Sequence, residues 1–560
     1  MAAYLPVLRA GFIWDDDLIL THNELIRAAG GLRQIWFSTL ATDYWPVTYT
    51  SFWVEWRLWG LHAAGYHATN LALHLADALL LWAVLRRWRM PGAFLAALLF
   101  AVHPVNVESV AWIAERKNLL AMLFCLLSAL AYGRAYGLSL LAFALAMLSK
   151  GSAALLPAVL LGTAVGMRRP TRRDLLRIAP FFLVAGAFVL VDIWFQKHGT
   201  GIVFRRVGPT ERLLGAAAAG WFYLSKAIFP LHLCFVYPRW RVDAANPLWW
   251  LPLAAAVGVS AALIAWRRRL PALLGAWLYF WVMLIPALGF TDVFFMQYSL
   301  VADHYQHLAL VGVVAAAAVG WAAWRSRSRA ADVAAAALVA VLALLTWRQC
   351  RIYHDPVTLY RATLAQNPDA WLAHNNLGEI LVADPASLPE AMDHFRAAIR
   401  LDPSSSRPHD SLGDALTRSG RFPEAIAELE IAIRLEPGDP AAHNNLGNAL
   451  DHSGRPLEAL AQYEAALKLD PKRPAPWFNL GGVHYRLGET RLRQGHADEA
   501  FREFEAALRY NPNLAEAHND LGVILYRAGR TSEAIGQFEA ALRIRPDYAP
   551  ARANLAKARP

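Results

Sequence analysis

The sequence predicts an all-α protein in two parts: a polytopic membrane helix bundle over residues 1–350 and a solenoid of paired helices over residues 351–560. Apolar residues make up 56% of the 560-residue chain and charged residues only 18%, which is too apolar for an ordinary soluble protein. Apolar runs fill the first part, and a pattern of about 34 residues recurs through the second.

The first part contains apolar runs suited to helices that cross or enter a bilayer. They lie near residues 66–85, 92–112, 119–136, 138–149, 152–166, 177–195, 213–236, 248–266, 271–290, 306–324 and 331–347. The first apolar stretch, Met1–Ile13, is shorter than the roughly 20 residues that span a membrane. It is either a short span whose flanking side chains reach the interface, or a longer span inside which the start of the sequence lies. We expect the second.

Four basic clusters predict the topology. They lie at Arg86–Arg89, Arg168–Arg173, Arg267–Arg269 and Arg325–Arg329. The positive-inside rule places all of them in the cytoplasm. Together with the partial first span this gives about eleven crossings, and it puts Asp15–Asp17 and the second part on the same outer face. The count requires the run 213–236, which contains Lys226, Pro230 and His232, to re-enter the membrane rather than cross it.

The charge distribution argues against a nucleic-acid partner. Residues 1–354 hold 31 Lys and Arg against 16 Asp and Glu, a net charge of +15, and residues 355–560 hold 23 against 28, a net charge of −5. The basic excess therefore lies in the apolar part, in short clusters between runs, where membrane topology explains it. We expect membrane lipid, and no nucleic acid, among the partners.

The second part repeats a Leu-Gly pair and a closing proline. The pairs are Leu377-Gly378, Leu412-Gly413, Leu446-Gly447, Leu480-Gly481 and Leu521-Gly522, and the prolines are Pro403, Pro437, Pro471, Pro512 and Pro546. The pattern resembles the tetratricopeptide repeat, in which two antiparallel helices form each unit. The units are 369–403, 404–437, 438–471, 472–512 and 513–546, with a cap over 547–560. The longer fourth unit has seven extra residues around Glu489–Gly495, which form either a helix extension or a bulged loop.

One polar residue precedes each Leu-Gly pair. These residues are Asn376, Ser411, Asn445, Asn479 and Asp520. Their pattern resembles the asparagine ladder of the repeats in O-linked N-acetylglucosamine transferase, because an amide can pair with an extended peptide as both donor and acceptor. We expect Asn376, Asn445, Asn479 and Asp520 to bind an acceptor polypeptide. The alternative is that they are solvated consensus positions.

Three adjacent carboxylates, Asp15, Asp16 and Asp17, follow the first apolar stretch directly. Carboxylates at a membrane boundary are costly unless they face water or a bound partner. The cluster therefore indicates chemistry at the membrane surface. The alternative is a hydrated loop that helps to fix the topology.

Several strings in the first part resemble one family. They are Gly11–Asp16, Trp45–Thr48, Gly65–Leu71 with His74, His103–Val110, Glu115–Asn118 and Leu148–Lys150. Together with the repeats they resemble the transmembrane and tetratricopeptide repeat-containing protein O-mannosyltransferases and their bacterial relatives. These enzymes are of the GT-C glycosyltransferase class. The resemblance covers nearly the whole chain and implies a GT-C-like membrane bundle.

The resemblance implies a reaction and residues for it. The protein would move a sugar, expected to be mannose, from a polyprenyl-phosphate carrier to Ser or Thr hydroxyls of an exported protein that the repeats recruit. Asp15 would be the general base, Asp16 would orient it or bind the acceptor, and Glu108 would support either role. Arg116, Lys117, Lys150 and His304 would hold the donor phosphate. No ligand set for a metal is recognisable, although Glu108 leaves a divalent cation open.

Two positions depart from the family pattern. Gly151 stands where an acidic residue usually follows the lysine, and His304 stands in place of an arginine that could hold phosphate. Both departures bear on the donor site. They favour a second reading of the chain, a non-catalytic membrane-anchored scaffold that assembles envelope proteins. A transporter fits the hydropathy but lacks paired broken helices in matching halves.

Composition without eukaryotic sorting signals indicates a bacterial inner-membrane protein whose repeats face the periplasm. The sequence leaves the sugar, its lipid carrier and the acceptor protein open.

Overall fold

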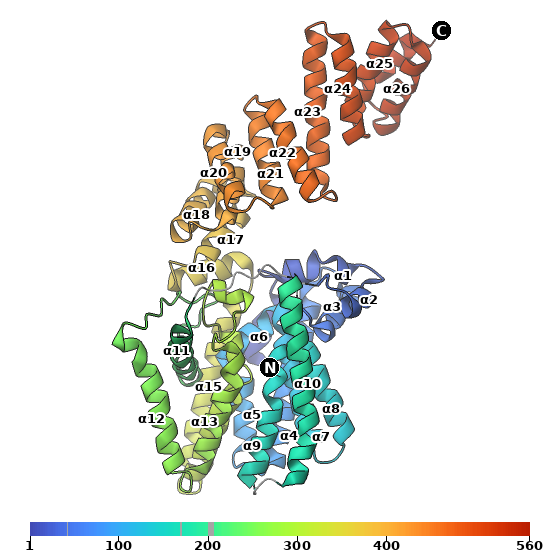
Figure 1. Cartoon of the computed structure of the whole chain (residues 1–560). Coiled ribbons are helices and arrows are strands. Elements are labelled where there is room, and N and C mark those ends of the chain that lie inside the picture. Colours follow the sequence, from blue (N-terminus) through green and yellow to red (C-terminus); the bar gives the residue numbers. More distant parts are fainter. Residues whose placement is uncertain (42, 168–170, 200–206, 560) are drawn as a thin grey trace. The chain divides into compact units, whose positions relative to one another are not determined.

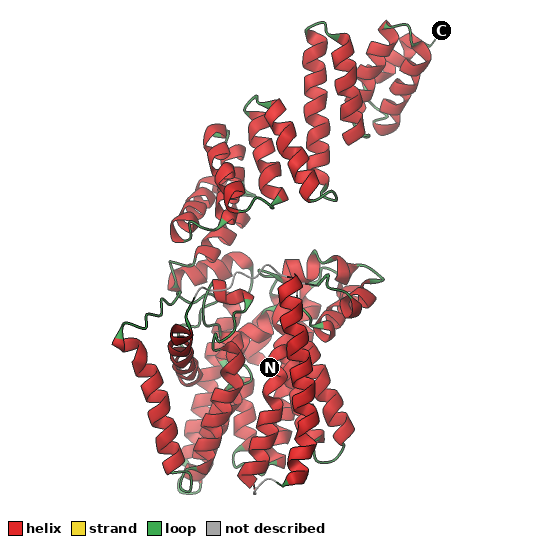
Figure 2. Cartoon of the chain, in the orientation of Figure 1, coloured by secondary structure: helices red, strands yellow, loops and turns green. Residues whose placement is uncertain are grey.

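A computed structural model describes residues 1–41, 43–167, 171–199 and 207–559. All regular elements in these residues are helical, which confirms the predicted all-α class (Figure 2). The chain divides into two compact units, Met1–Ala370 and Trp371–Pro560. We call them the membrane unit and the repeat unit.

The membrane unit is built mainly from apolar helices (Figure 1). Its α-helices are α1 (Glu24–Arg27), α2 (Gly31–Phe37), α3 (Pro46–Trp59), α4 (Ala63–Arg87), α5 (Ala93–Ala101), α6 (Val107–Ala111), α7 (Arg116–Ala131), α8 (Tyr136–Ser149), α9 (Leu156–Met167), α10 (Arg172–Gly199), α11 (Pro209–Ile228), α12 (Leu251–Ala265), α13 (Pro271–Leu284), α14 (Leu310–Arg325), α15 (Ala330–Ile352) and α16 (Pro356–Gln366). A short π-helix, η2, covers Asp17–Thr21. Short 3-10 helices include η4 (Ile113–Glu115), η5 (Gly151–Leu155) and η9 (Asp303–Gln306).

By length and composition, four of the described helices can cross a membrane: α4, the Arg172–Phe195 part of α10, Pro247–Ala265 and α15. The pair Ala93–Ala101 and Pro104–Ala111 passes the same test together but bends by 51°. Four further apolar helices are shorter: Tyr136–Ser149, Gly151–Thr163, Pro271–Ala287 and Leu310–Arg325. The predicted run 213–236 is not one helix, because α11 ends at Ile228 and the chain beyond it is irregular as far as Asn246.

Basic side chains of α4 and α10 meet at the α7–α8 turn of the membrane unit. Arg87 at the end of α4 lies against Gly133 in the α7–α8 turn, and Arg177 near the start of α10 donates to the Tyr132 carbonyl at 3.2 Å in the same turn. Figure 1 shows the α12–α13 turn at the lower end of this unit and α1–α3 at the upper end. Arg168 and Arg169 of the second predicted cluster lie outside the described residues.

The boundary between the units differs from the one expected at residues 350/351. Helix α16 packs on the membrane unit, because Gln366 donates to the Leu233 carbonyl and Asn367 donates to the Val236 carbonyl, both at 3.0 Å. The division therefore falls after Ala370.

The repeat unit consists of helix pairs, as predicted (Figure 1). They are α17 (Trp371–Leu381) with α18 (Leu388–Leu401), α19 (Ser406–Arg418) with α20 (Phe422–Leu435), α21 (Pro440–His452) with α22 (Pro456–Leu469), α23 (Pro474–Arg493) with α24 (Ala497–Tyr510), and α25 (Ala515–Arg527) with α26 (Thr531–Ile544), followed by α27 (Ala549–Ala558). In four of the five predicted Leu-Gly pairs, those of Gly378, Gly413, Gly447 and Gly522, the glycine admits a large side chain of its partner helix. A Cβ on Gly378, for example, would lie 2.6 Å from the Phe395 ring.

The fourth unit aligns differently from the prediction. Its first helix, α23, has 20 residues, so the extra residues extend the helix and do not form a bulge. Gly488, not Gly481, lies against the partner-helix ring, at 2.6 Å from Phe504. The seven extra residues therefore precede Gly488 rather than follow it. They add about two turns, which keeps the helix face in register.

Candidate active site

The loop after the 3-10 helix η1 (Ala2–Arg9) carries the predicted aspartates. Trp14 has a positive φ of 46°, a conformation that non-glycine residues rarely adopt and that packing must hold. Its ring contacts Trp112, Phe235 and Phe295 with centroids 5.1–5.6 Å apart. These ring contacts hold the loop in place. The next residue, Asp15, accepts through Oδ1 a 2.8 Å hydrogen bond from the Trp112 indole N–H.

Asp15 and Asp16 have different surroundings. Asp15 is half-buried, and burial raises its pKa to about 6 against the opposing effect of Lys117. Asp16 is fully buried. Its two oxygens accept hydrogen bonds from the backbone N–H groups of Ile13 at 2.9 Å and Ala114 at 2.8 Å. Asp16 therefore ties the loop to the segment before α7, and Asp15 is the aspartate with an oxygen left for chemistry.

Glu108 meets the late loop that contains His304. Its side chain is 1% exposed, and Oε2 accepts from the His304 backbone N–H at 2.8 Å and lies 3.2 Å from His304 Nδ1. The neighbouring Asp303 accepts from the Tyr237 hydroxyl at 3.0 Å, and burial together with Glu108 raises the Asp303 pKa. Glu108, predicted from the sequence, and His304, 196 residues later, therefore lie side by side.

Glu115 is the centre of the cationic part of the site. Its carboxylate lies 2.7 Å from Lys117 Nζ and 3.3 Å from Lys150 Nζ, and His304 Nε2 lies 3.9 Å away. Burial alone would raise the Glu115 pKa, but His304, Lys117 and Lys150 together lower it. Asn118 completes the arrangement, since its carbonyl oxygen accepts from Lys150 at 2.7 Å. Lys117, Lys150 and His304, predicted separately, thus converge on a carboxylate to which the sequence prediction gave no role.

Arg116 lies elsewhere, although it was grouped with these cations. Its guanidinium is fully buried. It pairs with Glu55 and donates to Asn70 Oδ1 at 2.7 Å and to the Tyr66 carbonyl at 3.0 Å. With its donors used inside the protein, Arg116 joins α3, α4 and α7 and is not placed to receive a ligand.

Two further carboxylates lie at this site, Asp43 near the lysines and Asp192 against Gly151. Asp43 lies close enough for its charge to act on Lys117 and Lys150. Asp192 of α10 lies against Gly151, where a Cβ would meet Asp192 Oδ2 at 2.5 Å. Gly151 thus leaves room for a carboxylate supplied by another helix. An acid inside the span Arg172–Phe195 was a sequence signal for Asp192, because carboxylates within spans are rare and functional by default.

The pKa values of Lys117 and Lys150 shift in opposite directions. Burial lowers the Lys150 pKa to about 8, with Lys117 adding to the fall and Glu115 opposing it. For Lys117, burial is outweighed by Glu115 and Asp15, which raise its pKa. Lys117 also lies 4.4 Å from the centroid of the Trp45 ring, a cation–π contact. Lys117 is therefore a permanent charge, and Lys150 titrates near neutrality.

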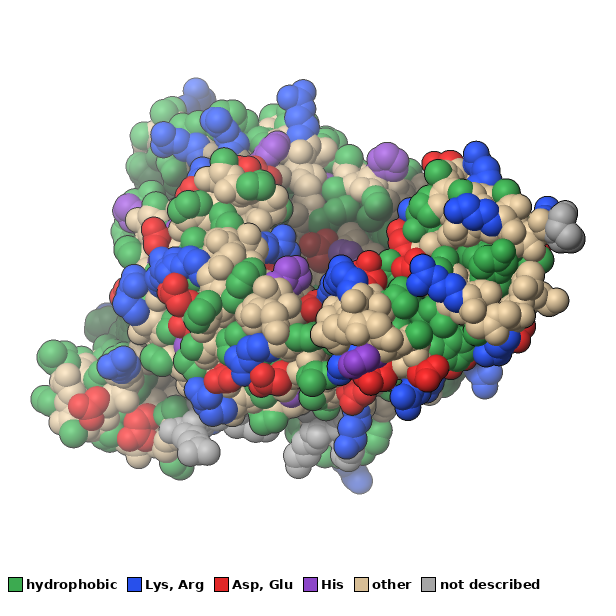
Figure 3. Space-filling model, turned by 90° about the horizontal axis from the view of Figure 1, so that it is seen from above, with side chains coloured by type: hydrophobic (Ala, Val, Ile, Leu, Met, Phe, Trp, Pro, Cys, Tyr) green, Lys and Arg blue, Asp and Glu red, His purple; other side chains and the backbone are tan. Residues whose placement is uncertain are grey.

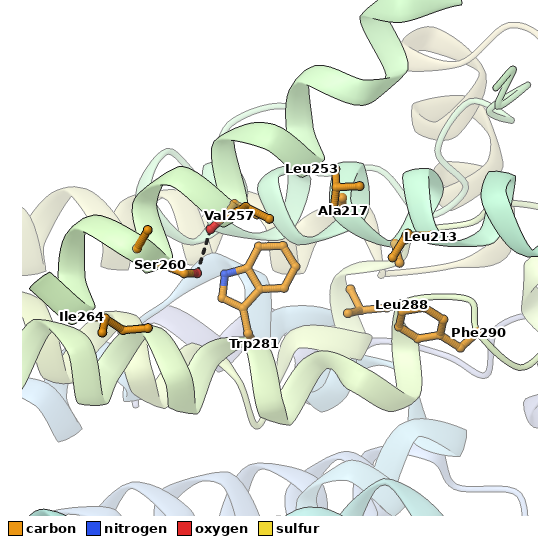
Figure 4. A pocket seen from close by; sticks show the side chains of 12 residues that line it. Leu213, Ala217, Leu253, Val257, Ser260, Ile264, Trp281, Leu288 and Phe290 are labelled. Atoms are coloured by element: carbon orange, nitrogen blue, oxygen red, sulfur yellow. Dashed lines mark hydrogen bonds between the residues drawn. The ribbon is translucent and has the colours of Figure 1, made fainter. Parts of the chain in front are cut away.

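An apolar cleft opens between α11, α12 and α13, with a volume of about 490 Å³. Figure 4 shows Trp281 projecting into it between Leu253 and Ser260 on one side and Leu288 on the other. Its lining is almost wholly hydrocarbon, and this composition suits a lipid chain.

The predicted ladder residues of the repeat unit join neighbouring repeats. Asn445 donates to Asp410 at 2.9 Å, Asn479 donates to Asn444 and Asn448 at 2.9 Å, and Asp520 accepts from the Tyr485 hydroxyl at 3.0 Å. Asn376 is 7% exposed. Asn445 and Asn479 are half-buried, and among the described residues their side-chain oxygens accept no hydrogen bond.

In the fourth unit the residue before Leu487-Gly488 is Arg486, which pairs with Asp451. Asn479 therefore stands two turns before the ladder position. On the face shown in Figure 3, acidic and basic side chains are interspersed. Within the described parts of the chain, no three His, Cys, Asp or Glu side chains are grouped so that they could hold a metal ion.

Several known proteins resemble this chain. A family model for the tetratricopeptide repeat matches residues 353–406, 411–474, 449–490 and 485–549. The chain is 23% identical over 435 residues to protein O-mannosyl-transferase F38B6.6 of Caenorhabditis elegans, covering 72% of this chain and 61% of that protein. It is 26% identical over 475 residues to human protein O-mannosyl-transferase TMTC4, covering 69% and 63%.

Among solved structures, YrrB, described as a TPR protein with an unusual peptide-binding site, aligns with 22% identity and a TM-score of 0.28 over 35% of this chain and 97% of that one. The chain spans about three fifths of the length of the two curated relatives above. The resemblance drawn from the sequence motifs is confirmed: residues 353–549 contain tetratricopeptide repeats, and the chain is similar in sequence to protein O-mannosyl-transferases.

Proposed function

We propose that this chain is a membrane glycosyltransferase of the GT-C class. It moves a sugar, mannose by analogy with its relatives, from a polyprenyl-phosphate donor to Ser or Thr hydroxyls of an exported polypeptide. The observation that carries the proposal is the convergence of a half-buried aspartate, Asp15, with the Glu115–Lys117–Lys150 cluster through Trp112 and the segment before α7.

Asp15 is the general base in this proposal. As the donor's C1–phosphate bond breaks and the bond from C1 to the acceptor oxygen forms, the hydroxyl proton passes to a carboxylate. A raised pKa of about 6 suits this task, because a base is most effective when its pKa lies near the working pH. Trp112 holds one Asp15 oxygen and leaves the other for the hydroxyl.

Lys117 and Lys150 hold the departing phosphate. Their ammonium groups carry the positive charge that the leaving phosphate needs, and Glu115 keeps them charged and close together. The cleft between α11, α12 and α13 is proposed to take the donor's hydrocarbon chain. The repeats recruit the polypeptide and raise its concentration at the site, in a bacterial inner membrane with the repeat unit on the periplasmic side.

Sugar transfer by the purified protein tests the proposal. Protein in detergent receives radiolabelled polyprenyl-phosphate mannose and a periplasmic extract, and label in polypeptide is counted. We expect label to enter protein, and we expect reactions without extract to show none. If folded protein transfers no label from mannose or from a panel of other polyprenyl-phosphate sugars, the chain is not this enzyme and a scaffold role gains weight.

The pH profile of transfer should be bell-shaped. Below pH about 6 Asp15 becomes protonated and cannot accept the hydroxyl proton, so kcat/KM falls. Above pH about 8 Lys150 loses its charge and the phosphate is held less well, so kcat/KM falls again. A Lys150→Arg variant should lose the upper limb, because arginine stays charged. A profile that is flat through both values would contradict these roles.

Replacing Gly151 with alanine should disturb Asp192. The new Cβ would stand 2.5 Å from Asp192 Oδ2, so the carboxylate must move from its place beside Gly151. We expect Gly151→Ala and Asp192→Ala each to lower transfer about tenfold, because both remove the Asp192 carboxylate from its place beside Gly151. The double variant should be no worse than either single one. Gly162→Ala is the control, since nothing lies within 4 Å of its added methyl group.

A further inference from the structure

Helix α10 brings one carboxylate, that of Asp192, to the candidate active site. Asp192 Oδ2 lies 2.5 Å, and its Cγ 3.7 Å, from the position that a Cβ on Gly151 would take. Gly151 directly follows Lys150 and begins η5, which packs on α10. Asp192 also lies within the Arg172–Phe195 span. A carboxylate inside a span is costly unless it faces water or a partner, and such residues mark sites of function.

The segment before α3 brings a second carboxylate, that of Asp43, to the same place. The ring of its neighbour Tyr44 lies 5.4 Å from the ring of Phe195 on α10, measured between centroids. Shortly after it, the Thr48 hydroxyl donates to the Ser149 carbonyl at 3.1 Å. These two contacts hold the segment against α10 and against the end of α8, where the lysine of the site begins the next turn.

The two carboxylates lack donors from the protein itself. Among the described residues, no N–H or O–H group donates to the side chain of Asp43 or of Asp192. Both side chains are half-buried, so part of each stays accessible from outside. The charge of Asp43 acts on Asp192 and on Lys117 and Lys150. Partly buried acceptors without donors are costly, and these two are open to a ligand beside the lysines.

A sugar hydroxyl is the ligand that fits these two groups. An ionised carboxylate can only accept hydrogen bonds, a hydroxyl can donate one, and a bond to a charged acceptor is stronger than a neutral one. A metal ion fits less well, because Lys117 and Lys150 would repel a cation and the described residues offer no group of three ligand side chains. A sugar joined to phosphate lies next to whatever holds that phosphate.

We propose that Asp43 and Asp192 form the sugar subsite of the donor and bind hydroxyl groups of an uncharged sugar. The proposal rests on the proposed function, in which Lys117 and Lys150 hold the donor phosphate. The two aspartates bind the sugar and transfer no proton. The subsite rejects sugars that carry a carboxylate, because their negative charge would face two others. Gly151 serves the subsite, since its missing side chain leaves the room that Asp192 occupies.

Competition binding tests the subsite without turnover. Protein in nanodiscs, with no acceptor present, binds radiolabelled polyprenyl-phosphate mannose, and unlabelled lipids displace it. We expect polyprenyl-phosphate mannose to compete about tenfold better than polyprenyl phosphate without a sugar, the bare carrier, because the sugar adds hydrogen bonds to charged acceptors. Polyprenyl-phosphate mannuronate should compete no better than the bare carrier. Equal competition by the mannose-bearing and bare carriers would overturn the proposal.

Asparagine at both positions tests the charge. The double variant Asp43→Asn, Asp192→Asn keeps the size of both side chains but removes their negative charges. Polyprenyl-phosphate mannuronate should then compete about tenfold better than it does with the wild type, a gain that misfolded protein cannot produce. Affinity for the bare carrier should not change. Asp174→Asn is the matched control, because Asp174 lies on the same helix about 27 Å from Asp192 at 1.5 Å per residue.

The outcomes separate the subsite from the proposed function. Preferential binding of the mannose-bearing carrier without any transfer of label to polypeptide would keep the subsite and refute the transfer reaction. Transfer by a double variant whose preference among the three carriers matches that of the wild type would keep the reaction and refute the subsite. Folded protein that binds none of the carriers would overturn both.

Discussion

Asparagine in place of Asp15 should lower sugar transfer by about 10²–10⁴-fold, the usual contribution of a general base. The substitution preserves shape, and the asparagine carbonyl oxygen can still accept the Trp112 hydrogen bond. What is lost is the ability to take a proton from the acceptor hydroxyl. Because substrate contacts remain, the loss should appear in kcat, while KM for the donor stays close to that of the wild type.

The neighbouring aspartates provide matched controls. Asp17 is exposed and its carboxylate accepts, among the contacts described, only from the Thr21 hydroxyl at 2.8 Å, so Asp17→Asn should transfer normally. Asp16→Asn should behave differently from both, because one of two backbone N–H groups would then face an amide N–H. That variant should be less stable to heat as well as slower. Normal transfer by Asp15→Asn would remove the cluster from the mechanism.

The parts of the fold that follow from periodic sequence patterns could be predicted, because they depend on interactions between residues close together in the chain. The repeat helices, their glycine contacts and the all-α class follow from spacing alone. The alignment of the fourth repeat was wrong because α23 holds two Leu-Gly pairs, Leu480-Gly481 and Leu487-Gly488, seven residues apart. Only packing distinguishes them: Gly488 faces the Phe504 ring, and Gly481 faces Asn511 and Ala507 at the end of α24.

The candidate site was predictable where a motif carries its own chemistry. Asp15, Glu108, Lys117, Lys150 and His304 come from separate strings and lie in one connected cluster. The split between Arg116 and Lys117 was not predictable. Adjacent residues at the start of a helix point about 100° apart, and only tertiary structure tells which one faces Glu55 and which faces Glu115.

Asp192 shows a second reason why part of the candidate site could not be predicted from the sequence. Gly151 read alone is a missing acidic residue, whereas in the fold it is the space that Asp192 of α10 occupies. A carboxylate can reach one position from any helix that passes it. Sequence motifs record the residue type at a position, not the groups that other elements bring there.

Glutamine in place of Glu115 should lower both the thermal stability of the protein and its sugar transfer. Glu115 is 1% exposed, and Lys117 and Lys150 are 10% and 16% exposed at their side chains, so the three charges depend on one another. Removing one partner of a buried ion pair costs about 3–5 kcal/mol because the remaining charge is left uncompensated. We expect Glu115→Gln to unfold at a clearly lower temperature in nanodiscs and to lose nearly all transfer.

A second substitution separates the two effects. Since Glu115 supports the charged form of Lys150, the single variant leaves a lysine that sheds its proton more readily. Adding Lys150→Met removes that buried lysine, so the double variant should regain part of the lost thermal stability. It should not regain transfer, because no ammonium group remains at position 150 to hold the phosphate. If the double variant transferred sugar as the wild type does, the cluster would be a structural ion network, and phosphate recognition would have to be sought at other cations.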